Sequence, residues 1–211
     1  MIKESQQKIL NMISYAKNPK VSYGGTKYEY GYHSLDIGEL LIKGQRNITK
    51  RISLIPYNFK NKTVLDIGCG PGGMLHALSN VINYGVGIDR DYKQINVANA
   101  VKDINSEYLL HFYVMDLINE PLTLIQDFLM VYKKVDVCFF LSLAKWISNW
   151  TEVLKYCKSI SNTLIFESNG KDQQQQKQEN FIKKVYNNVK LISKTSDDDP
   201  KQKNRRLYIC G

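Results

Sequence analysis

The feature that most constrains this fold is the stretch Val64-Leu65-Asp66-Ile67-Gly68-Cys69-Gly70-Pro71-Gly72-Gly73. Its apolar run ends in a carboxylate and then breaks at once into glycines, which predicts a buried strand that turns tightly into a helix. Gly68, Gly70 and Gly72 can adopt positive φ and let a ligand approach the backbone closely. We therefore expect a ligand loop with open N–H groups, followed by a helix whose positive end faces the ligand.

From Thr63 onward, apolar runs alternate with segments of helical spacing. Such alternation predicts an α/β fold, with a doubly wound, mostly parallel, seven-stranded sheet covered by helices on both faces. The expected strands are Thr63–Ile67, Gly85–Ile88, Leu109–Met115, Val135–Leu141 and Thr163–Phe166. The expected helices are Gly73–Asn80, Tyr92–Val101, Pro121–Tyr132, Thr151–Ser161 and Gln178–Val189. Lys190–Lys194 and Arg205–Cys210 predict an antiparallel C-terminal hairpin, and the glutamine tract 173–176 is expected to be surface only.

Residues 1–60 predict a helical, tyrosine-rich lid on a core formed by residues 61–211, in a single domain of 1–211. The spacing of apolar residues predicts a helix over Ile2–Ala16 and a short hairpin around Gly38. Asn47 is expected to cap a further helix that ends near Leu54. The tyrosine-rich stretch Tyr23–His33 lies between the first helix and the hairpin.

The composition restricts the partners. The formal net charge is +9 in 211 residues, which favours anionic partners such as RNA or sugar phosphates, although lysines that serve only as a solvated surface would give the same charge. The four cysteines are scattered, so we expect reduced thiols in a cytoplasmic protein. No apolar run is long enough to span a membrane, and the polar first residues show no secretory signal. The oligomeric state is not predicted.

Carboxylates end three successive predicted strands, at Asp66, Asp89 and Asp116. In a doubly wound sheet, ligands bind outside the carboxyl ends of the strands. Gly68-x-Gly70-x-x-Gly73 also matches the dinucleotide fingerprint, but Asp66 would repel a pyrophosphate, whereas it would hold an ammonium or sulfonium group. This disfavours a nucleotide-linked dehydrogenase.

Asp66-x-Gly68-x-Gly70-x-Gly72, followed by those acids, resembles the first motifs of class I S-adenosylmethionine (SAM) methyltransferases over roughly 63–211. The resemblance implies an enzyme that converts SAM into S-adenosylhomocysteine (SAH), with no metal expected. Asp66 and the loop would hold the methionine part, Asp89 the ribose and Asp116 the adenine. The implied cofactor residues are Asp66, Gly68, Cys69, Gly70, Gly72, Asp89, Arg90, Met115, Asp116, Leu117 and Leu141.

By the same resemblance, the tip of the fourth strand would face the transferable methyl group. Its segment Leu141-Ser142-Leu143-Ala144-Lys145-Trp146-Ile147 is similar to one in the methylphosphate capping enzymes, which methylate a terminal phosphate of RNA. It lacks the motifs for adenine or C5-pyrimidine methylation. The similarity implies that Ser142 and Trp146 contact the acceptor, and that Lys145 positions an anionic oxygen, which needs no general base. A second reading is that the two tryptophans of this loop only pack.

The predicted lid supplies the other acceptor candidates. Tyr32–Arg46 is similar to lids of bacterial methyltransferases that act on sugars, glycans or their phosphates. Arg46 is expected to bind the SAM carboxylate or an acceptor phosphate bidentately, or else to be a surface arginine at the start of a helix. Tyr30, with Tyr23 and Tyr28, is expected to stack on a base or sugar of the substrate, or else to form a small core within the lid. A hydroxyl acceptor would need a base, for which His33 is the first candidate and Glu167 the second.

Three classes of function stay open at this point. The first is SN2 methyl transfer to an oxygen of an anionic small molecule, glycan or RNA end. The second is a catalytically silent module of the same fold that binds RNA or a partner protein. The third is a tRNA or small-molecule O- or N-methyltransferase.

Overall fold

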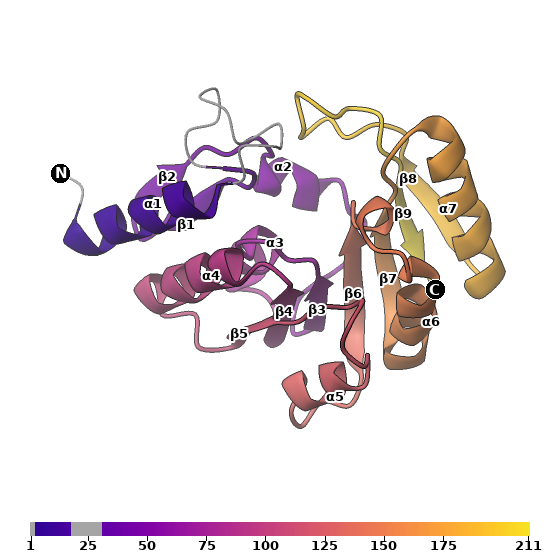
Figure 1. Cartoon of the computed structure of the whole chain (residues 1–211), viewed down its shortest axis with the longest axis horizontal. Coiled ribbons are helices and arrows are strands. Elements are labelled where there is room, and N and C mark those ends of the chain that lie inside the picture. The colour runs from indigo at the N-terminus through magenta and orange to yellow at the C-terminus, as the bar shows by residue number, and fades with distance from the viewer. Residues whose placement is uncertain (1–2, 18–30) are drawn as a thin grey trace.

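The computed structural model describes residues 3–17 and 31–211. Their order of elements is α1 (Glu4–Ala16), β1 (Leu35–Ile37), β2 (Leu40–Ile42), α2 (Ile48–Ser53), β3 (Thr63–Ile67), α3 (Gly73–Leu78), β4 (Tyr84–Asp89), α4 (Tyr92–Asn105), β5 (Leu110–Val114), α5 (Leu124–Phe128), β6 (Val135–Leu141), the 3-10 turn η1 (Ala144–Trp146), α6 (Trp150–Ile160), β7 (Ser161–Glu167), α7 (Asp172–Val185), β8 (Val189–Ser193) and β9 (Leu207–Cys210). Figure 1 shows these elements around one central sheet.

The central sheet has seven strands in the order β5-β4-β3-β6-β7-β9-β8. The strands from β5 to β7 are parallel, whereas β9 pairs antiparallel with both β7 and β8. Asp66 of β3 stands opposite Gly87 of β4 and Phe139 of β6, so the carboxyl ends of these strands reach one edge. This confirms the predicted doubly wound sheet with a C-terminal hairpin.

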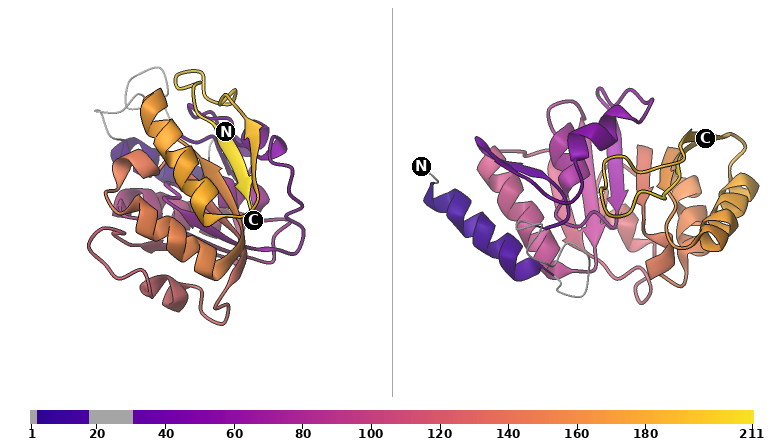
Figure 2. Two further views of the ribbon diagram at one scale, coloured as in Figure 1. Left: turned by 90° about the vertical axis from the view of Figure 1, so that its right-hand side faces the viewer. Right: turned by 90° about the horizontal axis from the view of Figure 1, so that it is seen from above.

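Successive residues of each strand alternate between two apolar cores because side chains alternate across a sheet. Val64 and Phe139 lie in one core, with side chains of α2, α3 and α4, while Leu65 and Phe140 lie in the other, with side chains of α5, α6 and α7. The helices therefore cover both faces of the sheet, as Figure 2 shows.

The helix α1 packs beside α4 and not above the strand tips. Its apolar side chains Ile9 and Ile13 share a small core with Val97 and Val101 of α4 and with the β1–β2 hairpin. Residues 31–34, 44–46 and α2 continue from this core toward the strand ends, where a bridge joins His33 to Arg46. Asn47 caps α2 by accepting a hydrogen bond from the Lys50 amide, as predicted.

Two predicted helices differ from the structure by more than a shift at one end. The last one begins at Asp172, before the glutamine tract, so the tract forms the first turns of α7. Gln175 is buried there because its side chain accepts from Ser168 Oγ and donates to the carbonyls of Gly170 and Asn204. The expectation that this tract is only surface was wrong for Gln175, whereas the other three glutamines are exposed. Conversely, α5 covers Leu124–Phe128 only, a shorter helix than predicted.

Candidate active site

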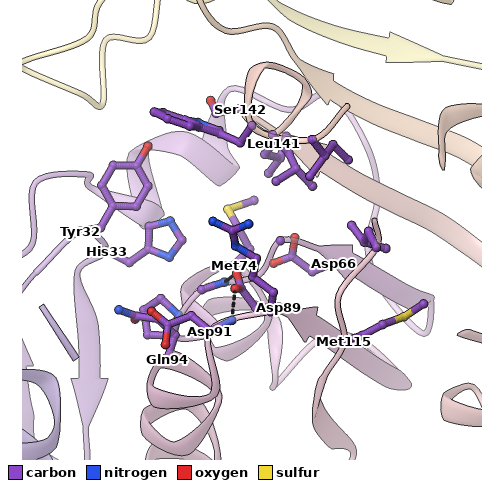
Figure 3. Close-up of a pocket in the computed structure, with 18 of the residues that line it drawn as sticks. Tyr32, His33, Asp66, Met74, Asp89, Asp91, Gln94, Met115, Leu141 and Ser142 are labelled. Carbon is purple, nitrogen blue, oxygen red and sulfur yellow. Dashed lines mark hydrogen bonds between the residues drawn. The ribbon is translucent and has the colours of Figure 1, made fainter. Parts of the chain in front are cut away.

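A cavity of about 370 Å³ lies at the carboxyl ends of β3, β4, β5 and β6, a size typical of small-molecule sites. Figure 3 shows side chains from the strand tips and from residues 32–33 converging on it. Tyr32, His33, Arg51 of α2, and Gln202 and Arg205 from the segment between β8 and β9 also border the cavity. The lining residues that the argument uses are Tyr32, His33, Arg51, Asp66, Gly68, Gly70, Asp89, Arg90, Met115, Asp116, Leu117, Leu141, Ser142, Trp146, Gln202 and Arg205.

The glycine loop adopts the predicted backbone conformation, but three of its backbone amides already donate hydrogen bonds to β4. Gly68, Gly70 and Gly72 have φ of 76°, 54° and 78°. At Gly70, a Cβ would meet no atom within 4 Å, so the backbone there is open to a ligand. The amides of Gly68 and Cys69 both donate to the Ile88 carbonyl, and that of Gly70 donates to Asp89 Oδ2. The expectation of open N–H groups was wrong for these three residues, because their amides are hydrogen-bonded to the last two residues of β4.

Asp66 is a buried carboxyl group at the tip of β3 that lines the cavity. Burial raises its pKa to about 7, while the positive charge of Arg51 opposes that rise. Desolvation penalises a carboxylate unless a cation compensates it. Asp66 is therefore suited to hold a cationic group of a ligand.

The next two acids are held by backbone groups. Asp89 accepts from the Gly70 amide and the Asp91 amide, at 2.9 Å each, and burial raises its pKa. These two hydrogen bonds fix its carboxylate at the carboxyl end of β4 (Figure 3). Asp116 accepts from the Ile118 amide, which lowers its pKa, and also from Asn119 Nδ2. Asp116 thus caps its own turn while it borders the cavity.

Arg51 of α2 is a buried cation that sequence reasoning missed. Its Nη2 lies 2.9 Å from Glu167 Oε2, yet within the described part of the chain neither Nε nor Nη2 has a hydrogen bond of good geometry. Burial and the neighbouring charge of Arg46 lower its pKa. Its place on the apolar side of a short helix, three residues after Ile48, is the signal that would have found it.

Arg46 does not reach the cavity. Its side chain is 0% exposed and bonds both oxygens of Glu167 at 2.8 Å, as well as Asp198 at 2.6 and 2.9 Å. A guanidinium that already holds two carboxylates has no free fork for a ligand anion. The expectation that Arg46 binds SAM or a phosphate was therefore wrong, and its role is to hold residues 44–46 onto β7.

Neither candidate base is suited to abstract a proton. The charges of Arg51 and Arg46 hold the pKa of Glu167 far below its usual range despite its burial. His33 lines the cavity, and burial lowers its pKa well below the ordinary value. Its Nδ1 is buried without a partner among the described residues, because the ring packs against Gly73. Both groups stay unprotonated at neutral pH and are weak bases.

Ser142 follows β6 with φ of 59°, a conformation that costs a non-glycine residue about 1 kcal/mol or more. Its hydroxyl donates to Glu167 Oε2 and accepts from Arg205 Nη1 at 3.0 Å. The same Nη1 donates to the Tyr32 hydroxyl at 2.8 Å. Arg205 thereby joins the tip of β6 to the segment around Tyr32. It comes from a uniformly polar loop, where no sequence signal singles it out.

The remaining predicted residues divide between the cavity and its surroundings. Trp146, which is 62% exposed, lies at its border. Lys145 is exposed beside the Trp146 ring and does not line the cavity, which argues against its expected role. Cys69 is buried against Gly87 and Gly72 against Phe112, and neither lines the cavity. Tyr30, with Tyr23 and Tyr28, lies outside the described residues. Arg90, Met115, Leu117 and Leu141 all border the cavity.

Comparisons with known proteins agree with this geometry. A family model described as a methyltransferase domain matches residues 58–205. No curated protein sequence matches the chain significantly. Among solved structures, the bifunctional kinase-methyltransferase WbdD is similar at 19% identity, with a TM-score of 0.64 over 96% of this chain and 46% of its own. The chain thus spans less than half the length of WbdD.

Two further structures share the fold. The N-terminal domain of EvdMO1, solved with SAH bound, has a TM-score of 0.68 at 8% identity, covering 97% of this chain and 96% of that one. Trm5b from Pyrococcus abyssi has a TM-score of 0.58 at 14% identity, covering 83% and 52%. At these identities the likeness concerns the fold alone.

A doubly wound sheet with a glycine loop after its first parallel strand and acids at the next strand tips defines a class I methyltransferase fold. The matched family model covers more than half of the sequence, so this chain belongs to the methyltransferase domain family. No helix among residues 3–17 and 31–211 is long and apolar enough to cross a membrane.

Proposed function

We propose that this protein is a SAM-dependent methyltransferase that transfers the methyl group to an oxygen of an anionic acceptor. The observation that carries the proposal is the opposite charge of Asp66 and Arg51 within one cavity. The methionine part of SAM carries an ammonium and a carboxylate group, which Asp66 and Arg51 would bind respectively. The fold shared with the SAH-bound domain of EvdMO1 supports this choice of cofactor.

The adenosine part would lie toward β4 and β5. Asp89, fixed by two backbone amides, would accept from the ribose hydroxyls. Met115 and Leu117 are buried side chains that line the cavity next to Asp116, and they would pack against the adenine ring. The side chain of Arg90 also lines this end. Both carboxylate oxygens of Asp116 already accept hydrogen bonds from Ile118 and Asn119 in its own turn. We therefore expect Asp116 to contribute less to SAM binding than Asp89.

The type of acceptor follows from whether the site contains a group that can remove a proton from it. In the SN2 step, a lone pair of the acceptor oxygen forms the new O–C bond while the C–S bond breaks, and sulfur keeps the electron pair. An alcohol would also have to lose its proton, for which Glu167 and His33 are both weak bases. An oxygen that is already anionic needs only orientation and a balancing cation. This favours a phosphate-bearing acceptor, whether a sugar, a glycan end or an RNA end.

Two measurements test the proposal. Calorimetry should show SAH binding to the wild type, and Asp89→Ala should weaken it at least tenfold, because a charge-assisted contact is lost. The matched control is Asp103→Asn on the exposed end of α4, which should bind normally. Binding of NAD but not SAH would overturn the cofactor assignment.

The second measurement is transfer of labelled methyl from SAM to paired acceptors. The pairs are a hexose phosphate with its free hexose, and a 5′-phosphorylated RNA oligonucleotide with its dephosphorylated form. We expect label only in phosphorylated members. Transfer to a neutral member alone would refute the anionic acceptor, and SAH binding without any transfer would favour a catalytically silent module.

A further inference from the structure

We propose that Arg205 forms, with Tyr32 and Ser142, a subsite for the phosphate group of the acceptor, separate from the cofactor contacts. This inference rests on the proposed function and assigns a place to its substrate. It also makes the segment between β8 and β9, which carries Arg205 and Gln202, the part of the chain that selects the acceptor.

The order of the strands places this subsite on the acceptor side. The sheet runs β5-β4-β3-β6-β7, so Asp89 and Met115 lie on one side of the β3 tip, and Ser142 and Glu167 on the other. Asp66, at the tip of β3, lies between them. A ligand whose adenosine covers β4 and β5 and whose ammonium meets Asp66 presents its far end toward β6 and β7. Arg205 borders the cavity at that end.

The geometry of Arg205 suits an anion. Its side chain is 9% exposed, and its described contacts use three N–H bonds, to the Tyr32 hydroxyl, Ser142 Oγ and Gln202 Oε1. A guanidinium has five N–H donors in a planar fork. Two donors therefore stay available for a ligand, within the part of the chain that the structure describes.

The charge of Arg205 is only partly compensated. The nearest carboxylate oxygens, on Glu167 and Asp199, lie 3.6 and 3.8 Å from its Nη1. Arg46 takes the shorter contacts of Glu167, at 2.8 Å. In a buried setting, a cation whose ion pairs are this long gains from an anionic ligand at hydrogen-bond distance.

Three chain segments meet around this cation. Tyr32 comes from the N-terminal region, Ser142 from the tip of β6 and Arg205 from the segment before β9. The Tyr32 hydroxyl and Ser142 Oγ accept from Nη1 and hold the guanidinium in place, and a guanidinium held in this way can bind phosphate oxygens with its remaining donors. Ser142 holds its strained φ within this cluster, and such strain is concentrated at ligand sites.

The test uses inorganic phosphate as the probe on protein saturated with SAH. Calorimetry should show phosphate binding that Arg205→Gln weakens about 10- to 100-fold, the range for one charge-assisted contact. Arg205→Lys should keep part of the affinity because it keeps the charge and loses the fork. The matched control is Arg206→Gln, since the neighbouring Arg206 pairs with Asp172 and Glu179 on α7 and should bind phosphate normally.

The other outcomes separate the two proposals. Equal phosphate affinity in Arg205→Gln and the wild type overturns the subsite. A parallel loss of SAH and phosphate affinity also overturns it, because Arg205 would then serve the cofactor. If SAH fails to bind the wild type, the proposed function fails, and phosphate titrated alone still tests Arg205. If Arg205→Gln does not fold, the Arg205 Nε–H resonance of the wild type decides: a shift with phosphate supports the subsite, and a constant resonance refutes it.

Discussion

Arg46 and Glu167 form a bidentate ion pair across 121 residues of sequence, with both N···O distances at 2.8 Å and almost no exposure of either side chain. This pair joins the N-terminal region to the end of β7. Arg46 reaches further to Asp198, and Gln45 to Asp199. The two segments that border the cavity above the strand tips are thereby held by one buried network.

Glu167→Gln should destabilise the protein by about 3–5 kcal/mol, because it leaves the buried charges of Arg46 and Arg51 without their shared carboxylate. Urea unfolding at pH 7 measures this change in the free energy of unfolding. Glu152→Gln, on the exposed side of α6, is the control and should change stability by less than about 0.5 kcal/mol. A loss of that small size in Glu167→Gln would contradict the role given to the pair.

The same residue predicts how stability depends on acid. The arginines lower the folded-state pKa of Glu167, so its contribution is complete above its ordinary pKa and is lost as pH falls through the folded value. Below about pH 4.5 the wild type should therefore lose stability with a steeper slope than Glu167→Gln. Thermal unfolding from pH 6 to pH 3 measures how the stability of each protein depends on pH. Equal slopes would show that the arginines do not lower the folded-state pKa of Glu167.

Cofactor affinity should depend on the protonation of Asp66. The pKa of its carboxyl group is about 7 without ligand, and binding of an ammonium group favours the ionised form. Affinity for SAH should thus fall about tenfold from pH 8 to pH 6. Calorimetry across that range measures it. Asp66→Asn should bind more weakly, with an affinity that varies far less with pH, and an equal pH dependence in this variant would refute the assignment.

Ser142 stores backbone strain that can be measured by two substitutions. Ser142→Ala loses the hydroxyl contacts and keeps φ of 59°, whereas Ser142→Gly loses the same contacts and relieves the strain. The glycine variant should be more stable than the alanine variant by roughly 1 kcal/mol. Chemical denaturation of both variants tests this. Equal stability would mean that the backbone at this position is not strained in solution.

Local patterns were sufficient for most of the fold. Alternation of strands and helices, the cap at Asn47 and positive φ in the glycine loop were all predicted correctly, because each depends on residues close in sequence. The start of α7 was missed, since Gln175 is buried only by bonds to Gly170, Asn204 and Ser168. Such partners depend on the fold and leave no local pattern.

The candidate site likewise has some features that local sequence determines and others that depend on contacts between distant segments. The sequence alone determined that Asp66, Asp89 and the glycine loop would meet at one edge of a parallel sheet, because strand ends are set by local hydrophobic pattern and sheet topology. Only the tertiary structure decided that the Arg46 guanidinium is fully hydrogen-bonded, chiefly to Glu167 and Asp198, and that Arg51 and Arg205 border the cavity instead. Which arginine uses all its donors within the protein and which borders the cavity depends on contacts between segments more than a hundred residues apart.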